Sequence, residues 1–324
     1  MEEITLDETD KKILFNLDFH SRMPLSLLSK KAGKSMQVLK YHLEKLQKEK
    51  VIEGFYADIN ASKIGYNIYL VYLKFGNMPE EKSKQFIKHL SEHESVGVNV
   101  GINGEFDHCT GIWAESVLSF EAKYRDIMKS YAKYVRKRVI MIETRFHYFK
   151  PKLFSKEKPE DEIVMEGEPK ILKLDKTDKK ILEILSSDAR KSLLDISEAT
   201  ELTPNAVKNR IKILEKEKII LGYRVMINYP ILGYLHYRVF LQMENLTEEK
   251  EKELTRLLKN LDPVISVTKT IGFCDLEFRC IIKDVDEFYN LMSEIRKNFP
   301  EIISYDSIIY HKFYEALNYY PFKE

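Results

Sequence analysis

Apolar positions recur at helical spacing near the start of the chain. Ile13, Leu14 and Leu17 fall on one face of a helix predicted over 10–17, where they can pack against a core. A short second helix is predicted over 25–31. Two helices with a shared apolar side indicate the start of a small helical domain.

A third helix is expected to begin at Ser35, because a serine hydroxyl can accept a hydrogen bond from a backbone N–H of the first turn. Leu39, Leu43 and Leu46 follow at helical spacing and are predicted to face inward. Residues 52–60 then combine β-prone side chains with a glycine, which predicts a small hairpin wing. The predicted order is helix, helix, turn, helix, wing.

The pattern next alternates between strands and helices. In the first expected strand, 66–75, apolar side chains occupy both faces, so both faces need cover. The order strand, helix, hairpin, helix, strand is that of a ferredoxin-like sandwich, whose helices cover only one face of the sheet. The elements expected here are strands at 66–75, 96–102, 106–114 and 139–147, and helices at 80–92 and 116–134.

The whole pattern returns 168 positions later. LDETDKKIL at 6–14 reappears as LDKTDKKIL at 174–182, and at this shift 23 of the 61 residues from 6 to 66 are identical without a gap. Such a repeat indicates one unit that has been duplicated. In the second unit Thr203 takes the N-cap position of the third helix, and Pro204 the first helical position, where its missing N–H costs nothing. The strands expected in the second sheet are 234–243, 264–271, 274–282 and 302–312, and its helices are 248–260 and 285–298.

A charged segment separates the two units. Residues 155–173, SKEKPEDEIVMEGEPKILK, contain two prolines and a glycine but few core-forming side chains, so we interpret them as a linker. We expect an α+β fold in which the uncovered faces of the two sheets pack on each other as an intrachain pseudo-dimer. The predicted domains are winged helix-turn-helix units at 1–62 and 174–230 and ferredoxin-like domains at 63–154 and 231–324.

The composition is that of a globular protein, with 324 residues, a formal net charge of +1 and 44% apolar residues. No apolar run approaches the ~20 residues needed to cross a bilayer, and the first four residues lack the basic and apolar start of a secretory signal. We therefore expect a cytoplasmic protein without a membrane partner. Cys109, Cys274 and Cys280 have no CxxC spacing, which argues against a disulfide framework or a structural zinc site.

Two basic helices contrast with this neutral composition. The third helix of each unit carries a net charge of +2 over 35–50 and +3 over 203–218. Their outward faces present groups that hydrogen-bond base edges or neutralise phosphates near the helix N-terminus, the end that enters the major groove. Such a helix is also common as a plain solvated surface, but three helices and a wing, present twice, favour double-stranded DNA as the partner. The candidate DNA-binding residues are Ser35, Gln37, Lys40, Tyr41 and Lys45 in the first unit and Thr203, Asn205, Lys208, Asn209 and Lys212 in the second.

Both units resemble a known family at these residues. RMPLSLLSKKAGKSMQVLKYHLEKLQKEKVIEGFYADINASKIGY, and more closely LTPNAVKNRIKILEKEKIILGYRVMINYPILGY, are similar to the winged helix-turn-helix of the Lrp/AsnC (feast/famine) transcription regulators. The resemblance implies sequence-specific DNA binding and adds Arg210, which matches the family's usual arginine in the recognition helix; His42 replaces it in the first unit. Family members usually carry one unit per chain and dimerise. Because the two helices of this chain differ, we expect two unlike half-sites.

The βαββαβ segments are similar to that family's effector-binding domain, whose hairpin signature appears here as GEFD and GFCD. By resemblance, an effector of the amino-acid class would bind near Gly104, Asp107, Gly272 and Asp275. A structural turn explains the same residues, because glycine permits positive φ and aspartate can bond nearby backbone N–H groups. Further homodimerisation of the chain is left open.

Two alternatives share this fold. One is a heme-precursor (siroheme-type) decarboxylase, but its histidine-rich hairpin signature is absent from 96–104 and 264–272. No glycine-rich phosphate loop, nucleophile elbow or HExxH motif occurs, and His89 and His93 have no third ligand at sensible spacing. We therefore predict no enzyme, catalytic residue, metal or cofactor. The other alternative is a ligand-binding or interaction protein whose helices do not bind DNA.

One charged stretch is not repeated. Residues 123–152 contain ten basic and two acidic side chains, whereas the matching stretch of the second unit is near neutral. A solvated surface is one interpretation. An auxiliary phosphate-contacting surface that includes Arg136, Lys137 and Arg138 is the other.

Overall fold

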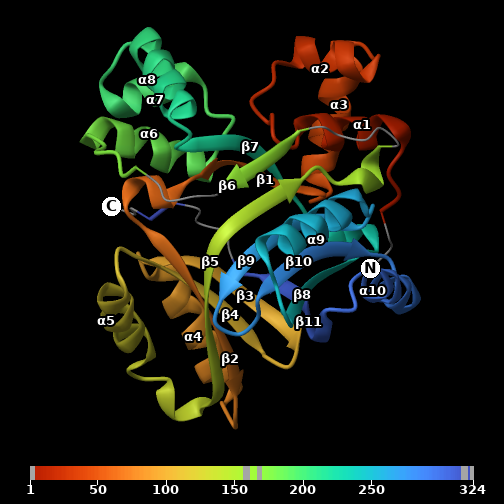
Figure 1. Cartoon of the computed structure of the whole chain (residues 1–324). Helices are drawn as coiled ribbons and strands as arrows, with labels where there is room; N and C mark the ends of the chain where they lie inside the picture. Colours follow the sequence, from red (N-terminus) through yellow and green to blue (C-terminus); the bar gives the residue numbers. More distant parts are fainter. Residues whose placement is uncertain (1–3, 156–160, 166–169, 315–319, 322–324) are drawn as a thin grey trace.

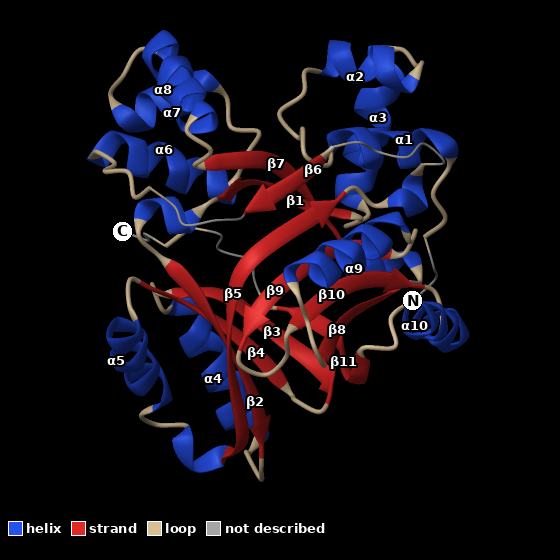
Figure 2. Ribbon diagram, viewed as in Figure 1, coloured by secondary structure: helices blue, strands red, loops and turns tan. Residues whose placement is uncertain are grey.

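A computed structural model describes residues 4–155, 161–165, 170–314 and 320–321. The first three residues, and 156–160 and 166–169 of the predicted linker, lie outside the described residues. The described part of the chain forms two helical heads, a two-stranded ribbon between them and a large sheet below (Figure 1). Figure 2 shows that the helices of the sheet domain lie outside the strands.

Each head is a bundle of three short helices, as the apolar stripes predict. Asp7 caps the first helix of head 1 in a reciprocal capping box, and Gly33, with φ of 66°, allows the tight turn before the third helix. Ile13, Leu28 and Leu39 meet in the core of this head. The helices are α1 (Glu8–Leu17), α2 (Leu25–Ala32) and α3 (Met36–Lys48) in head 1, and α6 (Lys176–Ser187), α7 (Leu193–Thr200) and α8 (Pro204–Lys216) in head 2.

The predicted hairpin wings are wrong. Each unit supplies a single strand, β1 (Ile52–Ile59) or β7 (Ile220–Ile227), and these two strands pair antiparallel with each other. The chain after β1 forms a 3-10 turn, η1 (Ala61–Ile64), instead of a returning strand. Because the neighbouring residues Phe55 and Tyr56, which point to opposite faces of the strand, are both buried, this exchange covers both faces of β1 while it satisfies the backbone.

Each sheet has the strand order of a ferredoxin-like domain. In unit 1 the order is β5-β2-β4-β3, and in unit 2 it is β11-β8-β10-β9. The outer helices are α4 (Glu80–Glu92), α5 (Val117–Met128), α9 (Glu248–Asn260) and α10 (Val285–Asn298), with η2 (Ala132–Tyr134) after α5. The strands are β2 (Asn67–Phe75), β3 (Val96–Gly104), β4 (His108–Ala114), β5 (Val135–Phe149), β8 (Leu235–Met243), β9 (Val264–Ile271), β10 (Leu276–Ile282) and β11 (Ile302–Phe313).

The expected pseudo-dimer is confirmed, and its two sheets are joined by hydrogen-bonded strand pairs at their edges instead of only packing face to face. Strand β3 pairs with β11 at one edge, and β5 pairs with both β2 and β9 at the other, so eight strands of the two units close into a ring. Side chains from both units, among them Tyr72, Met141 and Phe240, fill its inner apolar cluster. Closure pairs the edge backbone groups that an open sheet would expose.

Reciprocal hydrogen bonds mark the pseudo-two-fold relation of the units. Arg22 donates from its guanidinium to the carbonyl of Ala189, and Arg190 donates to the carbonyl of Ser21 at 2.7 Å. Positions 22 and 190, and 21 and 189, are each 168 residues apart. The duplication seen in the sequence therefore appears as a repeated contact in space.

The predicted linker is partly structured. Strand β6 (Glu162–Met165), which lies within it, pairs with β5, after the turn η3 (Lys152–Phe154). In the second unit the turn η4 (Tyr229–Leu232) takes the place of η1. None of the helices in the described ranges is long and apolar enough to cross a membrane.

Candidate nucleic-acid interface

Helix α3 is anchored by one face and presents the other to solvent. Leu39 and Leu46 are fully buried, and the Ser35 hydroxyl accepts a hydrogen bond from the Val38 N–H at 3.3 Å. On the outward face, Gln37, Lys40 and Tyr41 are exposed, and the tyrosine reaches 65% exposure. One face of α3 is thus buried in the core of head 1, and the other carries polar groups open to solvent.

Helix α8 repeats this arrangement with different chemistry. Pro204 starts it, and Thr203 caps it by accepting a hydrogen bond from the Ala206 N–H at 3.2 Å. Val207 and Leu214 are buried against α6 and α7. The predicted contacts on its outward face, Asn205, Lys208, Asn209 and Lys212, are all exposed.

Arg210 lies away from this outward face. Its guanidinium bonds the carboxylates of Asp175 and Asp178, both at 2.7 Å, at the start of α6. Backbone and Arg210 hydrogen bonds hold the pKa of Asp175 below its usual value, while burial opposes them. In this conformation Arg210 ties α8 to the start of α6, the first helix of its own head.

The equivalent place in head 1 holds a cluster that the sequence analysis did not identify. His42 Nδ1 lies 2.8 Å from the buried carboxylate of Asp10 and 3.8 Å from that of Asp7. Lys45, a predicted DNA contact, is 3.4 Å from the same Asp10 carboxylate. One ligand atom from each of Asp7, Asp10 and His42 lies within 4.8 Å of the others. The repeat carries the signal for this cluster, because both aspartates recur in head 2 whereas the histidine becomes Arg210.

The two glycine–aspartate hairpins lie at the seams of the ring. A side chain at Gly104 or Gly272 would collide with the backbone of the other unit, since a Cβ would lie 2.9 Å from the Ser307 oxygen or 2.4 Å from the Ile140 oxygen. Both glycines also have positive φ. These residues therefore close the pseudo-dimer.

The hairpin aspartates have matching backbone partners. Asp107 accepts a hydrogen bond from the Phe75 N–H, and Asp275 accepts one from the Met243 N–H, both at 2.8 Å. Lys74 also bonds Asp107, at 2.6 Å. These contacts explain the turn on structural grounds, and ligand binding at the hairpins stays a prediction.

The unrepeated basic stretch runs from the far end of the sheet domain to head 1, where Lys150 lies over the rings of Phe15 and Phe19. Its exposed triplet starts β5, at the opposite end of the molecule from α3 and α8 (Figure 1). Lys137 pairs with Glu105, and Arg138 donates to the Tyr124 hydroxyl at 3.2 Å. An auxiliary contact from this end would need a second segment of DNA.

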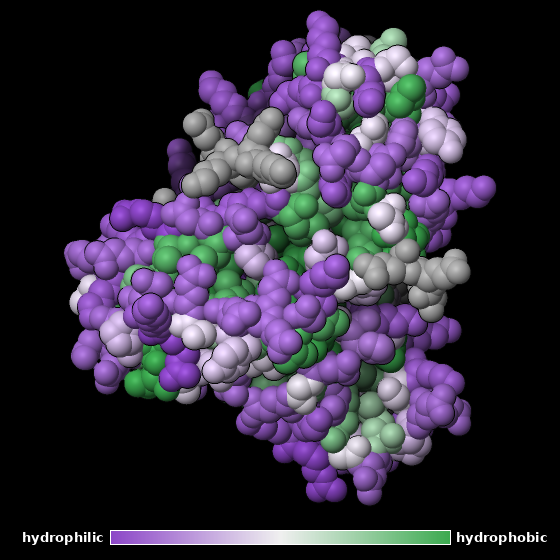
Figure 3. Space-filling view, turned by 90° about the vertical axis from the view of Figure 1, so that its right-hand side faces the viewer, coloured by the Kyte–Doolittle hydropathy of each residue, from purple (hydrophilic) through white to green (hydrophobic). Residues whose placement is uncertain are grey.

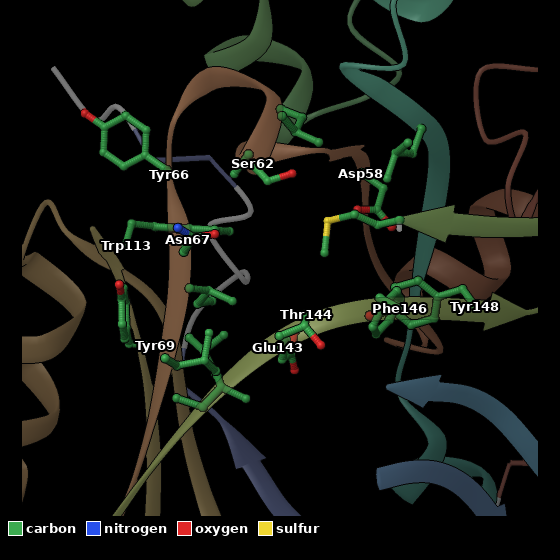
Figure 4. Close-up of a pocket in the computed structure, with 18 of the residues that line it drawn as sticks. Asp58, Ser62, Tyr66, Asn67, Tyr69, Trp113, Glu143, Thr144, Phe146 and Tyr148 are labelled. Atoms are coloured by element: carbon green, nitrogen blue, oxygen red, sulfur yellow. The ribbon is translucent and has the colours of Figure 1, made fainter. Parts of the chain in front are cut away.

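A cavity of about 420 Å³ lies between the ribbon and the inner face of the ring. In Figure 4, Asp58 and Ser62 of the ribbon side lie above it, and Glu143 and Thr144 of β5 lie below. The walls are mainly apolar and aromatic. The sequence analysis did not find this cavity, because its lining comes from strands of both units.

Family models match both heads. An AsnC-type helix-turn-helix domain matches residues 174–215, and a winged helix-turn-helix DNA-binding domain matches residues 6–53. The matches fall on the two segments whose recognition helices are described above.

Relatives and solved structures extend the match to the sheet domains. An HTH-type transcriptional regulator of Pyrococcus furiosus is 31% identical over 127 residues, which cover 39% of this chain and 82% of the relative. The HTH-type transcriptional regulator Ptr1 of Methanocaldococcus jannaschii is 32% identical over 121 residues, covering 37% and 80%. The siroheme decarboxylase NirDL, solved with an iron-uroporphyrin III analogue, matches 96% of this chain and 93% of its own, with a TM-score of 0.61 and 13% identity, and so shares the fold. The chain belongs to the Lrp/AsnC family, with two family units in one polypeptide.

Proposed function

We propose that this protein is a sequence-specific DNA-binding transcription regulator that reads two unlike half-sites with α3 and α8. The observation that carries the proposal is the pair of exposed, basic helix faces on heads at one end of the molecule (Figure 1). The ribbon β1–β7 joins the heads in a fixed pseudo-two-fold relation. Two-fold readers bind half-sites about one helical turn, ~34 Å, apart or a multiple of it.

The difference between the half-sites follows from the outward side chains. Helix α3 presents Gln37, Lys40 and Tyr41, whereas α8 presents Asn205 and Asn209 around Lys208. Asparagine and glutamine pair with adenine, and lysine pairs with guanine or phosphate, so different sets favour different base steps. We propose an imperfect palindrome as the operator.

Footprinting and gel-shift titration with the protein's own upstream region test this proposal. Lys40→Ala and Lys208→Ala should each weaken binding by about 1–3 kcal/mol, and each should relax protection in only one half-site. Lys88→Ala, an exposed lysine on α4, is the matched control and should bind as the wild type does. A symmetric site with equal loss for both variants would contradict unlike reading heads. Unchanged binding in both would contradict the recognition helices themselves.

The same resemblance supports an effector of the amino-acid class near the hairpins. Calorimetric titration of each of the twenty amino acids, followed by gel shifts with those that bind, tests this part. Absence of heat for all of them would remove that effector class without affecting the DNA-binding proposal.

The decarboxylase alternative rests on the fold alone. The described residues that line the cavity include no histidine. A Soret-type absorbance in the purified protein would reopen it. Failure to shift DNA at both low and moderate salt would instead favour a ligand-binding protein.

A further inference from the structure

We propose that the cavity between the ribbon and the ring binds a small organic cation, an amine with an apolar or aromatic body. This site is separate from the hairpins and from the recognition helices. It needs no DNA, so its test stands apart from that of the DNA-binding function.

The charges at the cavity leave one carboxylate in excess. Arg238 is shared between two acids, since it bonds Glu277 through two nitrogens and Glu143 at 2.7 Å. It also donates to the Tyr310 hydroxyl at 3.1 Å and lies over the Tyr72 ring. Arg238 offsets the charge of one of the two acids that it bonds. Asp58, which also lines the cavity, adds a third carboxylate.

The second guanidinium does not reverse this balance. Arg279 donates to the hydroxyls of Ser266 and Tyr148, at 2.8 and 2.5 Å, and stacks over the Phe146 ring at 5.3 Å. The nearby Arg224 is already paired with Asp18. Asp58, Glu143, Arg238 and Arg279 line the cavity, and Glu277, which does not line it, bonds Arg238. Together these groups carry a net charge of −1 when all are ionised.

The walls suit the body of such a cation. Tyr66, Tyr69 and Trp113 lie at one end of the cavity in Figure 4, and Asp58 lies toward the other, with Glu143 between them. Aromatic faces attract ammonium groups and apolar bodies alike. A volume of about 420 Å³ falls in the range of small-molecule sites. The cavity is drawn in Figure 4, whereas Figure 3 views the side of head 1, where apolar side chains gather between that head and the sheet domain with polar side chains around them.

Asp58 gives the site a proton linkage. Burial raises the pKa of Asp58 to about 6, and the groups that face it are Arg224 on β7 and Arg279 on β10, which lower it, and Asp18 after α1 and Glu143 on β5, which raise it. A bound cation favours the ionised carboxylate and so replaces the proton. Affinity should therefore fall about tenfold from pH 7.5 to pH 5, as the ionised fraction of a group with a pKa of about 6 declines.

The duplication predicts one site per chain. The positions 168 residues away from the charged lining groups carry other chemistry: Met226 replaces Asp58, Leu70 replaces Arg238 and Gly111 replaces Arg279. The positions related to these groups by the duplication, of which Leu70 lines the same cavity, therefore lack the acid and both guanidiniums. Binding should saturate at one ligand per chain.

Three probes with a similar body but different charge test the proposal: phenethylamine, phenylalanine and 3-phenylpropionate. Calorimetry on the full chain at pH 7.5 should give 1:1 binding of phenethylamine, with 3-phenylpropionate at least tenfold weaker and phenylalanine between them. Asp58→Asn should lower phenethylamine affinity at least tenfold and remove its pH dependence. Asp306→Asn, at an exposed aspartate of β11, is the control and should change neither.

Three results would overturn the proposal. They are tighter binding of 3-phenylpropionate than of phenethylamine, no binding of any probe, and equal phenethylamine affinity in Asp58→Asn and the wild type. Unfolding midpoints of both variants, measured without ligand, separate a lost site from a lost fold.

Discussion

One ion pair between the units offers a sharp test of how head 1 is held. Asp18, at the end of α1, bonds Arg224 of β7 through the arginine Nε at 2.6 Å and Nη2 at 3.2 Å. The two residues are 1% and 6% exposed. The repeat places Ser186 and Tyr56 at the equivalent positions, so head 2 has no such pair. The change proposed is Asp18→Asn, which keeps the shape and removes the charge.

The cost should be large because the remaining guanidinium stays buried and charged. Arg224 lies against the rings of Phe19 and Tyr148, at 4.9 and 4.2 Å from their centroids, and its Nη1 has no hydrogen-bond partner in the described part of the chain. Burial lowers the pKa of Arg224, and Asp18 more than offsets this in the wild type. Without Asp18 the guanidinium still keeps its proton, because arginine is not deprotonated in proteins. Breaking a buried pair by removing one partner costs about 3–5 kcal/mol.

Urea unfolding of the wild type, Asp18→Asn, Arg224→Met and Asp18→Asn/Arg224→Met would measure this cost as a double-mutant cycle. We expect each single change to destabilise by about 3–5 kcal/mol, and the double change to cost at least about 2 kcal/mol less than the sum. Ser186→Ala in head 2 is the matched control. A loss below about 1 kcal/mol for Asp18→Asn, or strict additivity, would refute the reasoning that the pair is a buried, coupled clamp.

Four further substitutions test three separate features. Glu201 ends α7 in the left-handed region, with φ of 55°, where head 1 has Gly33. Because a side chain strains this conformation, Glu201→Gly should stabilise the protein by about 1 kcal/mol in thermal unfolding, and Gly33→Ala should destabilise it by a similar amount. Opposite signs would contradict the argument from backbone strain. Gly272→Ala should lower the free energy of unfolding in urea by at least about 2 kcal/mol, since its Cβ would collide with the Ile140 oxygen. An unchanged free energy would mean that the backbone of the two units can move apart at this contact without cost. Burial raises the pKa of Asp58 to about 6 from 3.8, so the folded state loses stability as the pH rises through this range and the carboxylate ionises. Asp58→Asn should therefore stabilise the protein by at most about 3 kcal/mol at pH 8 and by nothing below pH 4. A stabilisation that does not change with pH would contradict this reasoning.

The sequence predicts local structure well because local rules decide it. Helices 80–92, 248–260 and 285–298 have the predicted bounds, and Ser35 and Thr203 are the N-caps of the recognition helices. Apolar spacing and capping residues act within a few positions, so one chain suffices to read them.

The pairings between units could not be predicted in the same way. Residues 52–60 satisfy a hairpin and an exchanged strand equally well, since both need β-prone side chains beside a glycine. The cavity has the same origin, because Asp58 and Arg279 are 221 positions apart. Only the relative placement of the two units brings such residues together.

Arg210 shows a different limit of prediction from the sequence. Its position matches a family arginine, but the aspartates that bond it lie 32 and 35 residues earlier. A comparison of the two units points to this contact. The aspartates Asp7 and Asp10 recur in the second unit, whereas Arg210 takes the place of His42.

The closed ring of strands also determines which other polypeptides can pair with this chain. A separate chain that offered a strand to the same edges would find both of them occupied within this polypeptide. Dilution cannot separate the two units, and a co-expressed chain cannot replace one of them, so the combination of heads is set by the gene and not by cellular protein levels.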